Sequence, residues 1–452
     1  MASNKTLCIA EWQAFGADNI KEILADKSEE KAQKIFAEFE NFAKESGDFD
    51  DRTGNHIFLM PCRKNGKNML KARNFVGLVQ TKSGFCLEIL PKTFRAKDEN
   101  EGFKNSQEKI TKAKEVLLNM LATLRDSPFK QSHISNLAIK NLPLLEVFAL
   151  MFLSELERLI KRGLKSDYVG REQNRRFLKG RLLFAQNLRQ NLAHKERFFT
   201  AADEYTADNA PNRLIKSTLL LLAAQGFSAK TSGRILQARF VFDEISPSKN
   251  IDKDFAQSVN FRRFKDYELL LLWCAVFLRR KNFLPYQGSQ SAFALLFDMN
   301  KLFESFVAWC LRKSLGGKCV VKAQEKAKFL AQKDGQNVFQ IKPDIAIYKK
   351  SDKNSPLIIA DTKWKILSDD ESANYEISQG DLYQMFAYLA KYQCYKGYLI
   401  YPKIQSKTAP KNLKLTYKAK LYFYENEQAH KDIELNIHFF KLEKYMQKIH
   451  GI

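Results

Sequence analysis

Two carboxylic acids and a lysine stand out in the last third of the chain because of their types and spacing. Asp361 and Lys363 lie two residues apart, directly after the apolar run Leu357–Ala360, which is typical of a strand covered on both faces. Side chains two residues apart in a strand point to the same face. Asp344 lies on the preceding apolar run, so a turn over residues 348–356 would bring it beside Asp361.

The chemistry that suits this set is phosphodiester hydrolysis with a divalent cation. A charged Asp and Lys at the end of an apolar strand cost desolvation free energy unless they bind something. Converging carboxylates suit Mg²⁺, with Mn²⁺ as an alternative, and a positive group is needed near the attacking water or the scissile phosphate. An acidic-x-Lys triplet alone carries little information, but Pro343-Asp344 is the only Pro-Asp pair in the sequence. The alternative is a set of surface salt bridges at strand ends.

The helix predicted over residues 380–393 carries further candidates. Gln384 and Tyr388 are four residues apart and share one helical face, and Asp381 can cap the start of the helix. Glu304, on an earlier predicted helix, lies at the rim of an apolar stripe and could add a third carboxylate to the metal site, directly or through water. The alternatives are ordinary helix packing for Gln384 and Tyr388 and a plain surface position for Glu304.

The elements that must position these residues form an α/β unit. Its predicted order is helix, strand, strand, helix, strand, over residues 297–315, 338–348, 356–367, 380–393 and 397–403. The patterns upstream predict a helix over 19–45, short strands over 55–95 with a Ser83-Gly84 hairpin turn, a polar loop over 97–108, and helices over 109–165 and 214–284. The segment 166–213 is rich in Arg and Asn and has little continuous apolar sequence.

A chain of 452 residues is too long for one compact core, so we expect two or three domains. The predicted fold class is α+β and multidomain, with a domain boundary in the Pro- and Gly-containing stretch 283–291. The predicted ranges are an N-terminal helix plus β-rich domain (1–125), a mainly helical middle region (126–285) and a C-terminal α/β domain (286–452).

Charge is the most unusual bulk property. The sequence has 74 Lys and Arg against 51 Asp and Glu, which gives a formal net charge of +23. Such a balance favours binding to polyanions, nucleic acid before an acidic membrane surface, although generally lysine-rich surfaces would also explain it.

The 7 cysteines form no CxxC pair, so we expect reduced core cysteines. The chain has no apolar run long enough for a membrane span or signal region, so we expect a cytoplasmic protein without a membrane partner.

Other enzyme classes lack their motifs here. No GxxxxGK[ST] phosphate loop, no GxSxG elbow and no HExxH helix occurs in the sequence. A nucleotide-hydrolysing motor, if one is needed, is therefore expected on another chain.

Several segments together resemble McrC, the family of nuclease subunits of McrBC modification-dependent restriction systems, within the PD-(D/E)xK nuclease superfamily. The segments that carry the resemblance are PDIAIY, IIADTKWK and DLYQMFAYLAKY around the candidate site, and FDMNKLFESFV, RFLKGRLLF, DEYTADNAPNRLIKSTL and FCLEILPKTF upstream. The resemblance extends over roughly residues 70–400 and implies a restriction-endonuclease-like fold for the C-terminal α/β domain.

The resemblance implies roles for the candidate residues. Asp344 and Asp361 are expected to bind Mg²⁺, and Lys363 is expected to orient or activate the attacking water. Gln384 and Tyr388 match the helix motif of RecB-like nucleases and are expected to position DNA or Lys363.

The resemblance also implies a division of labour with an McrB-like AAA+ GTPase hexamer. That partner binds GTP and recognises modified DNA, while the N-terminal part of an McrC chain enters the partner's ring and stimulates GTP hydrolysis. The Arg/Asn-rich segment is a candidate contact, and its candidate residues are Arg171, Arg181, Asp208, Asn212 and Arg213. The alternative for these residues is a structural role as buried caps and salt bridges.

The sequence therefore predicts the Mg²⁺-dependent DNA endonuclease subunit of an McrBC-like, GTP-dependent restriction complex that cleaves methylated foreign DNA. Two other functions stay open: a free-standing DNA repair or recombination nuclease, and a non-catalytic activator of a partner NTPase.

Overall fold

The structure is a computed structural model of the 452-residue chain. It describes residues 6–45, 49–50, 55–56, 58–94, 107–124, 127–129, 141–259, 265–279, 293–403, 415–422 and 430–442. The chain forms two compact units: the inserted unit, Leu145–Lys281, and the main unit, which joins Lys5–Leu144 to Asn282–Ile452. The division into three ranges at residues 125 and 285 is finer than this and stays a prediction.

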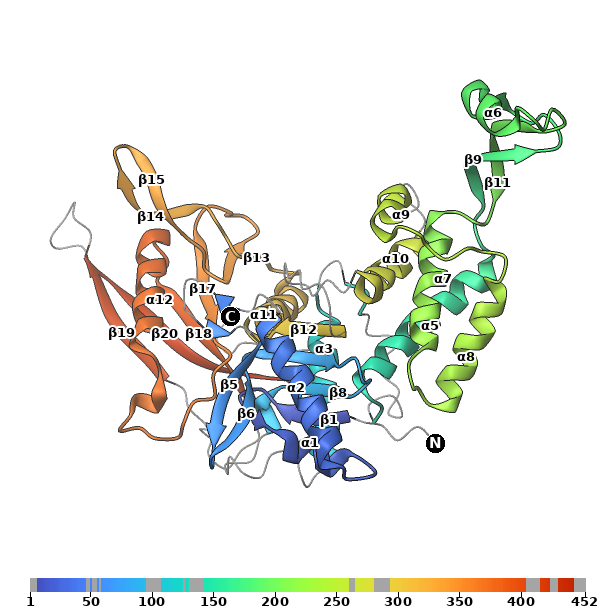
Figure 1. Ribbon diagram of the computed structural model, residues 1–452. Coiled ribbons are helices and arrows are strands. Elements are labelled where there is room, and N and C mark those ends of the chain that lie inside the picture. The colour runs from blue at the N-terminus through green and yellow to red at the C-terminus, as the bar shows by residue number, and fades with distance from the viewer. Residues whose placement is uncertain are drawn as a thin grey trace. The chain divides into compact units, whose positions relative to one another are not determined.

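The main unit begins with a four-stranded sheet built from both of its chain segments (Figure 1). In spatial order its strands are β1 (Thr6–Ala10), β8 (Cys86–Leu90), β7 (Phe75–Gln80) and β12 (Phe293–Asp298). Strand β7 approaches β12 closely at Gly77, where φ is +132° and a Cβ atom would meet the Leu295 carbonyl oxygen at 2.0 Å. Only glycine fits this position without a shift of the backbone.

Two helices, α1 (Ala17–Ile23) and α2 (Glu29–Glu45), pack into the core of this part of the main unit. The core includes edge-to-face aromatic pairs of Phe15 with Phe36 and Phe39, at centroid distances of 6.1 and 5.6 Å. The prediction of one continuous helix over residues 19–45 is wrong. The backbone becomes extended at Leu24 and has a positive φ at Lys27, and these residues separate α1 from α2. The Ser83-Gly84 turn is confirmed, with φ +80° at Gly84 and the Gly84 amide bonded to the Thr81 carbonyl oxygen.

Smaller elements complete the N-terminal segment of the main unit. They are the sheet β2 (Ala14–Phe15), β6 (Lys67–Ala72), β5 (Leu59–Lys64), the pair β3 (Phe49–Asp50) and β4 (Asn55–His56), the 3-10 turn η1 (Lys92–Phe94) and α3 (Gln107–Leu121). The predicted strands over residues 55–95 are thereby confirmed. The predicted polar loop over 97–108 falls almost entirely outside the described residues.

The C-terminal segment of the main unit is built on a six-stranded mixed sheet. In spatial order its strands are β13 (Cys319–Ala323), β16 (Ile345–Lys349), β17 (Pro356–Thr362), β18 (Lys396–Lys403), β20 (His430–Lys441) and β19 (Leu415–Tyr422). The central strands β17, β18 and β20 are parallel, and the outer pairs are antiparallel. The described chain therefore has the mixed α/β character that the sequence predicts.

Helices α11 (Met299–Leu315) and α12 (Gln379–Tyr392) cover this sheet. Leu435 of β20 lies in the cluster with Leu389 of α12, whereas Phe440 packs on Phe306 of α11 at a centroid distance of 6.0 Å. Odd and even positions of a strand face opposite sides, so the two helices lie on opposite faces. The predicted order of helix, strands, helix and strand is confirmed, and β13 was not predicted.

One predicted strand is wrong in its continuity. The run 338–348 divides into β15 (Gln336–Ile341) and β16, and β15 pairs with β14 (Lys328–Lys333) as a separate hairpin. The break falls at Pro343, which has no N–H to donate to a ladder. This break places Asp344 in the short loop that enters β16.

The inserted unit is mainly helical. Its helices are α5 (Leu144–Arg162), α6 (Phe184–Asn191), α7 (Ala210–Ala223), α8 (Ala229–Val241), α9 (Ile251–Gln257) and α10 (Lys265–Leu278). Helix α7 contacts α8, α9 and α10, and Phe152 of α5 packs on Phe277 of α10 at a centroid distance of 6.1 Å. Over the parts of the chain that are described, no helix is both long and apolar enough to cross a membrane.

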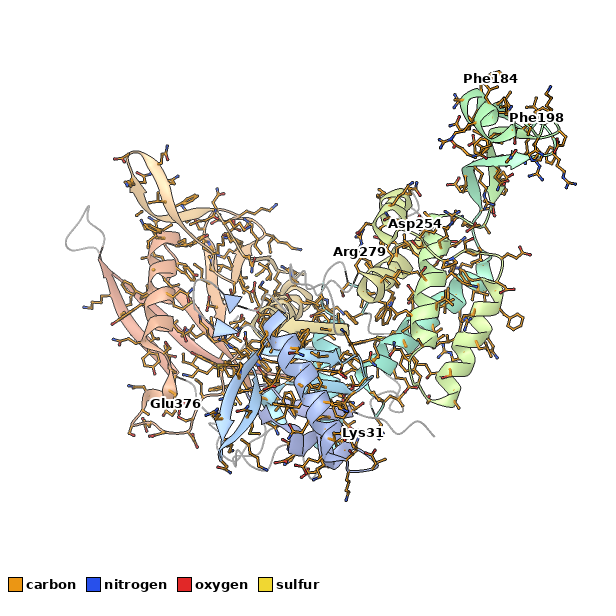
Figure 2. The ribbon with its side chains drawn as sticks, viewed as in Figure 1. Lys31, Phe184, Phe198, Asp254, Arg279 and Glu376 are labelled. Atoms are coloured by element: carbon orange, nitrogen blue, oxygen red, sulfur yellow. The ribbon has the colours of Figure 1, made fainter. Side chains whose placement is uncertain are left out.

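The Arg/Asn-rich segment forms a long antiparallel hairpin in the inserted unit. Strands β9 (Asp167–Arg175) and β11 (Phe198–Thr206) pair along their full lengths, and β10 (Arg181–Leu182) pairs with β11 beside α6. Figure 1 shows this hairpin leaving the helical body, and Figure 2 shows Phe184 and Phe198 at its far end. The hairpin was not predicted, because most of its side chains are exposed and no apolar face repeats along it.

Candidate active site

Asp344 and Asp361 meet at one end of the six-stranded sheet, as the predicted hairpin requires. Strands β16 and β17 are antiparallel with Ile345 opposite Ala360, so Asp344 lies beside the end of β17. The Thr362 backbone N–H and Oγ1–H both donate to Asp344 Oδ2, at 2.8 and 2.7 Å. These bonds fix one oxygen of Asp344 and leave Oδ1 for a further ligand.

Asp361 is a buried carboxylate that pairs with Lys363. The residue is 3% exposed, and Lys363 Nζ lies 2.9 Å from Asp361 Oδ2. The angles of this ion pair lie outside hydrogen-bond geometry, so Lys363 satisfies Oδ2 by its charge rather than by a well-aligned hydrogen bond. Burial, and next the charge of Asp344, raise the pKa of Asp361 to about 7.

Lys363 lies at the centre of a polar network on the end of β17. Its Nζ donates to Gln384 Oε1 at 2.9 Å and lies 3.2 Å from Asp381 Oδ1. Burial lowers the pKa of Lys363, but the charges of Asp361 and Asp381 outweigh burial, and the net shift is upward. Lys363 is therefore a cation that donates hydrogen bonds.

Gln384 and Tyr388 share one face of α12, as their spacing predicts, and a hydrogen bond links them. Gln384 Nε2 donates to Tyr388 Oη at 2.8 Å, and Tyr388 Oη donates to the Lys342 carbonyl oxygen at 3.2 Å. The chain of bonds thus runs from Lys363 through α12 to the backbone that precedes Asp344. The predicted capping role of Asp381 is wrong: the N-cap of α12 is Ser378, and Asp381 pairs with Lys363 instead.

Glu304 of α11 approaches the two aspartates but is held by another residue. Its Oε2 accepts a hydrogen bond of 3.3 Å from Gln324 Nε2. Burial, and next the charge of Asp344, raise the pKa of Glu304 to about 7. No group of three His, Cys, Asp or Glu side chains in the described ranges is close enough to form a metal site as it stands.

The donor set nevertheless fits a hard divalent cation. Asp361 Oδ2 is buried and makes no aligned hydrogen bond beside its ion pair with Lys363. Burial raises the pKa values of Asp344, Asp361 and Glu304, and the charge of further carboxylates adds to the rise for Asp361 and Glu304. Closely spaced carboxylates of this kind become stable as anions when a cation joins them. Asp344 and Asp361 could hold such a cation directly, and Glu304 could do so through water.

One buried cluster beside the site was not predicted. Trp364, the residue after Lys363, donates from Nε1 to Glu11 Oε1 at 2.6 Å, and its carbonyl oxygen accepts from Lys92 Nζ at 3.1 Å. The Lys92 backbone N–H also donates to Glu11 Oε1, at 3.1 Å. Burial raises the pKa of the fully buried Glu11, a shift that the charge of Lys92 opposes. A Glu in the apolar segment TLCIAEW was the only sequence signal for this cluster.

The candidate partner-contact residues lie in the inserted unit, and four of the five are held by internal bonds. Arg171 Nη2 and Arg213 Nε each lie 2.8 Å from an oxygen of Asp208. The amide nitrogen of buried Asn212 donates to the carbonyl oxygens of Ala207 and Lys165, at 2.8 and 3.2 Å.

Arg181 is the exception: it is exposed on β10. The other four residues, Arg171, Asp208, Asn212 and Arg213, make bonds within the inserted unit. A role in partner contact stays a prediction for all five.

The fold and the site together define a mixed α/β protein with a carboxylate and lysine cluster at the end of its sheet. A family model described as "McrBC 5-methylcytosine restriction system component" matches residues 70–402. This match covers well over half of the chain, so the chain belongs to that family, as the sequence resemblance predicted.

Solved structures that are similar to the chain include two McrBC assemblies. A refined half-complex of a tetradecameric assembly of Thermococcus gammatolerans McrB AAA+ hexamers with bound McrC matches with a TM-score of 0.64 and 19% identity, over 98% of this chain and 97% of that chain. A cryo-EM structure of the McrBC complex from the same organism matches with a TM-score of 0.43 and 24% identity, over 69% of this chain and 88% of that chain. The first likeness supports the fold. Curated proteins give no match.

Proposed function

We propose that the protein is the nuclease subunit of an McrBC-like restriction complex and cleaves methylated DNA by Mg²⁺-dependent phosphodiester hydrolysis in a PD-(D/E)xK domain. Membership of the McrBC family supports the restriction role. The observation that carries the nuclease role is the meeting of Asp344, Asp361 and Lys363 at one end of the sheet, where Lys363 Nζ lies 2.9 Å from the buried Asp361 Oδ2.

Each residue has a definite part in this proposal. Asp344 and Asp361 would hold Mg²⁺, which when bound polarises the phosphate and lowers the pKa of a water molecule. Lys363 orients the attacking water and offsets negative charge at the scissile phosphate, since its raised pKa keeps it protonated. Gln384 fixes the Lys363 ammonium, and Tyr388 fixes Gln384.

We also propose that an McrB-like AAA+ GTPase hexamer is the partner and binds the GTP. The similar Thermococcus structure contains McrB AAA+ hexamers with bound McrC, and this sequence has no phosphate loop of its own. The hairpin β9–β11 is the candidate contact, because it and α6 expose large apolar side chains, namely Tyr168, Phe177, Leu178, Phe184, Leu188, Leu192 and Tyr205. Such exposed apolar surface marks an interaction site.

The test of the nuclease role is cleavage of methylated duplex DNA by the chain together with its partner, GTP and Mg²⁺. Asp361→Ala and Lys363→Ala are each expected to lower the cleavage rate at least about 1,000-fold, because several kcal/mol of transition-state stabilisation are lost. Asp432→Asn, an exposed change on the same sheet, is the matched control and should cleave normally. Cleavage that survives either site change would refute the assignment.

Two other outcomes would identify the alternative functions. Cleavage by the isolated chain without partner or nucleotide would indicate a free-standing repair nuclease. Stimulation of partner GTP hydrolysis without any DNA cleavage in Mg²⁺ or Mn²⁺ would indicate a non-catalytic activator.

A further inference from the structure

The hairpin β14–β15 is built directly onto the candidate site. Its first arm follows Gln324, whose backbone N–H donates to the Asp344 carbonyl oxygen at 2.9 Å. Its second arm ends at Ile341, and the next carbonyl, that of Lys342, accepts the Tyr388 hydroxyl. Each arm has six residues and so extends about 20 Å. Figure 1 shows the hairpin extending past the end of α12.

Phe339 on this hairpin is both exposed and held in an unfavourable backbone conformation. It is 74% exposed, and its φ is +57°, in the left-handed region that non-glycine residues avoid. The strand register pairs Phe329 with Gln340 and Ala331 with Val338, and it leaves out Leu330 and Phe339 between them. Leu330 is also exposed, at 44%. An aromatic ring kept in solvent at a cost in backbone energy points to a role outside the fold.

The same hairpin carries unneutralised positive charge. Lys326, Lys328, Lys333 and Lys342 are all exposed, and none of them has an ion pair among the described residues. Between residues 326 and 342 the only acidic residue is Asp334, at the turn of the hairpin. A ribbon with exposed aromatic and lysine side chains is complementary to a nucleic acid, whose phosphates bind lysine and whose bases stack on aromatic rings.

The distribution of exposed rings in the main unit supports this surface. Its strongly exposed Phe and Tyr side chains among the described residues are Phe339, Tyr383 and Phe386. The last two lie on α12, the helix that also carries Gln384 and Tyr388 and that contacts β14. Within the described part of this unit, the exposed aromatic side chains therefore lie on the two elements that border the candidate site.

We propose that the β14–β15 hairpin enters a groove of duplex DNA next to the scissile phosphate, with Lys328 and Lys333 on the phosphates and Phe339 against the bases. A two-stranded ribbon fits the major groove, which is about 12 Å wide, and apolar wedges of this kind also enter base steps. The inference rests on the proposed function, since it gives the same site its DNA-holding surface. It adds a binding element that none of the residues named for cleavage supplies.

The electrostatic test measures binding of the full chain to a fluorescent 30-bp duplex by anisotropy, in EDTA and over a series of KCl concentrations. Lys328→Ala/Lys333→Ala is expected to reduce the magnitude of the slope of log Kd against log[KCl] by about 2, because each phosphate contact contributes about 0.9. Lys350→Ala is the control: Lys350 is exposed in the turn after β16, at the opposite end of the strands from Asp361. It should leave the slope unchanged.

The aromatic test separates a DNA-contacting role from a structural one. Phe339→Ala should weaken binding about 5- to 100-fold without changing the salt slope, as expected for one lost base contact. Phe339→Gly should weaken binding equally, yet its Tm should be unchanged or higher because glycine accepts a positive φ without strain. Ile23→Ala, a partly exposed residue on α1, is the control for loss of surface apolar area.

The proposal is overturned if the wild-type chain does not bind the duplex, if the lysine pair behaves as Lys350 does, or if Phe339→Gly loses stability and keeps its affinity. These outcomes are separate from failure of the proposed function, since binding is measured without metal and cleavage is measured with it. Normal binding with no cleavage would remove the nuclease role and leave the hairpin role standing.

Discussion

At the scale of single residues, the site is a cluster of three carboxylates whose pKa values are raised by burial. Burial and mutual repulsion raise the pKa of Asp361 and of Glu304 to about 7. An acid whose folded pKa is raised binds more protons folded than unfolded between its unfolded value, about 4, and about 7. Its contribution to stability is therefore present at low pH and is lost as pH rises through that window.

These raised pKa values predict a pH-dependent effect of metal on stability. In EDTA at pH 8, Asp361→Asn should raise the Tm by about 3–6 °C, because it removes a charge repelled by Asp344. At pH 4 the same change should have little effect. Mg²⁺ should raise the Tm of the wild-type chain at pH 8 and should not raise that of the variant. A scanning calorimetry series at the two pH values measures this, and an equal Mg²⁺ effect in both proteins would contradict it.

A second prediction concerns the bond chain behind Lys363. Tyr388→Phe removes the hydroxyl that accepts from Gln384 and donates to the Lys342 carbonyl oxygen. Gln384 then holds the Lys363 ammonium less firmly, and we expect the turnover rate to fall about 10-fold with little change in KM. Tyr417→Phe, a half-buried residue on the edge strand β19, is the matched control. Steady-state cleavage kinetics with partner and GTP would show the difference.

The site residues could be predicted from the sequence to a large extent. Asp361 and Lys363 share a strand face by simple alternation, and Asp344 belongs to the only Pro-Asp pair. The capping role predicted for Asp381 was wrong, because the sequence alone does not distinguish an Asp that caps a helix from an Asp that pairs with a lysine. Glu11 could not be assigned, since its partner Trp364 lies 353 positions away.

At the scale of elements, the Glu11–Trp364 bond joins the segment after β1 to the residues that follow β17, beside the candidate site. Trp364→Phe leaves the buried Glu11 carboxylate with one donor fewer, and we expect the free energy of unfolding of the main unit to fall by about 2–4 kcal/mol. Adding Glu11→Gln should restore part of this loss, because the unpaired charge disappears. Urea unfolding of the four proteins of this double-mutant cycle measures the coupling. Strictly additive losses would show that the bond contributes nothing.

The predictability of elements depended on whether one face is buried. Helix α11 and strands β17 and β18 have buried apolar patterns and were found from the sequence. Hairpins β14–β15 and β9–β11 are exposed on most of their residues, so no alternation marks them. The break between β15 and β16 comes from Pro343, which the apolar pattern alone did not show.

At the scale of the whole molecule, the inserted unit is expected to serve the partner and the main unit the DNA. Replacing residues 176–197 by a short Gly-Ser turn should abolish stimulation of partner GTP hydrolysis and nucleotide-dependent cleavage. It should leave the Mg²⁺-dependent Tm shift of the main unit intact, because no site residue is touched. Co-purification and GTP hydrolysis assays test the first part, and calorimetry tests the second. Full stimulation by the shortened chain would refute the contact assignment.

The pairing of β12 with β7 also constrains how the molecule is made. Strand β7 ends at Gln80, but the strand that completes its sheet is not synthesised until Asp298. The inserted unit lies wholly between the two strands in sequence and can fold as it leaves the ribosome, whereas the N-terminal sheet must wait with an unpaired edge. The late pairing must also be exact at Gly77, because β12 approaches β7 there so closely that no side chain fits. Translation speed over the inserted unit should therefore influence how much of the protein folds correctly.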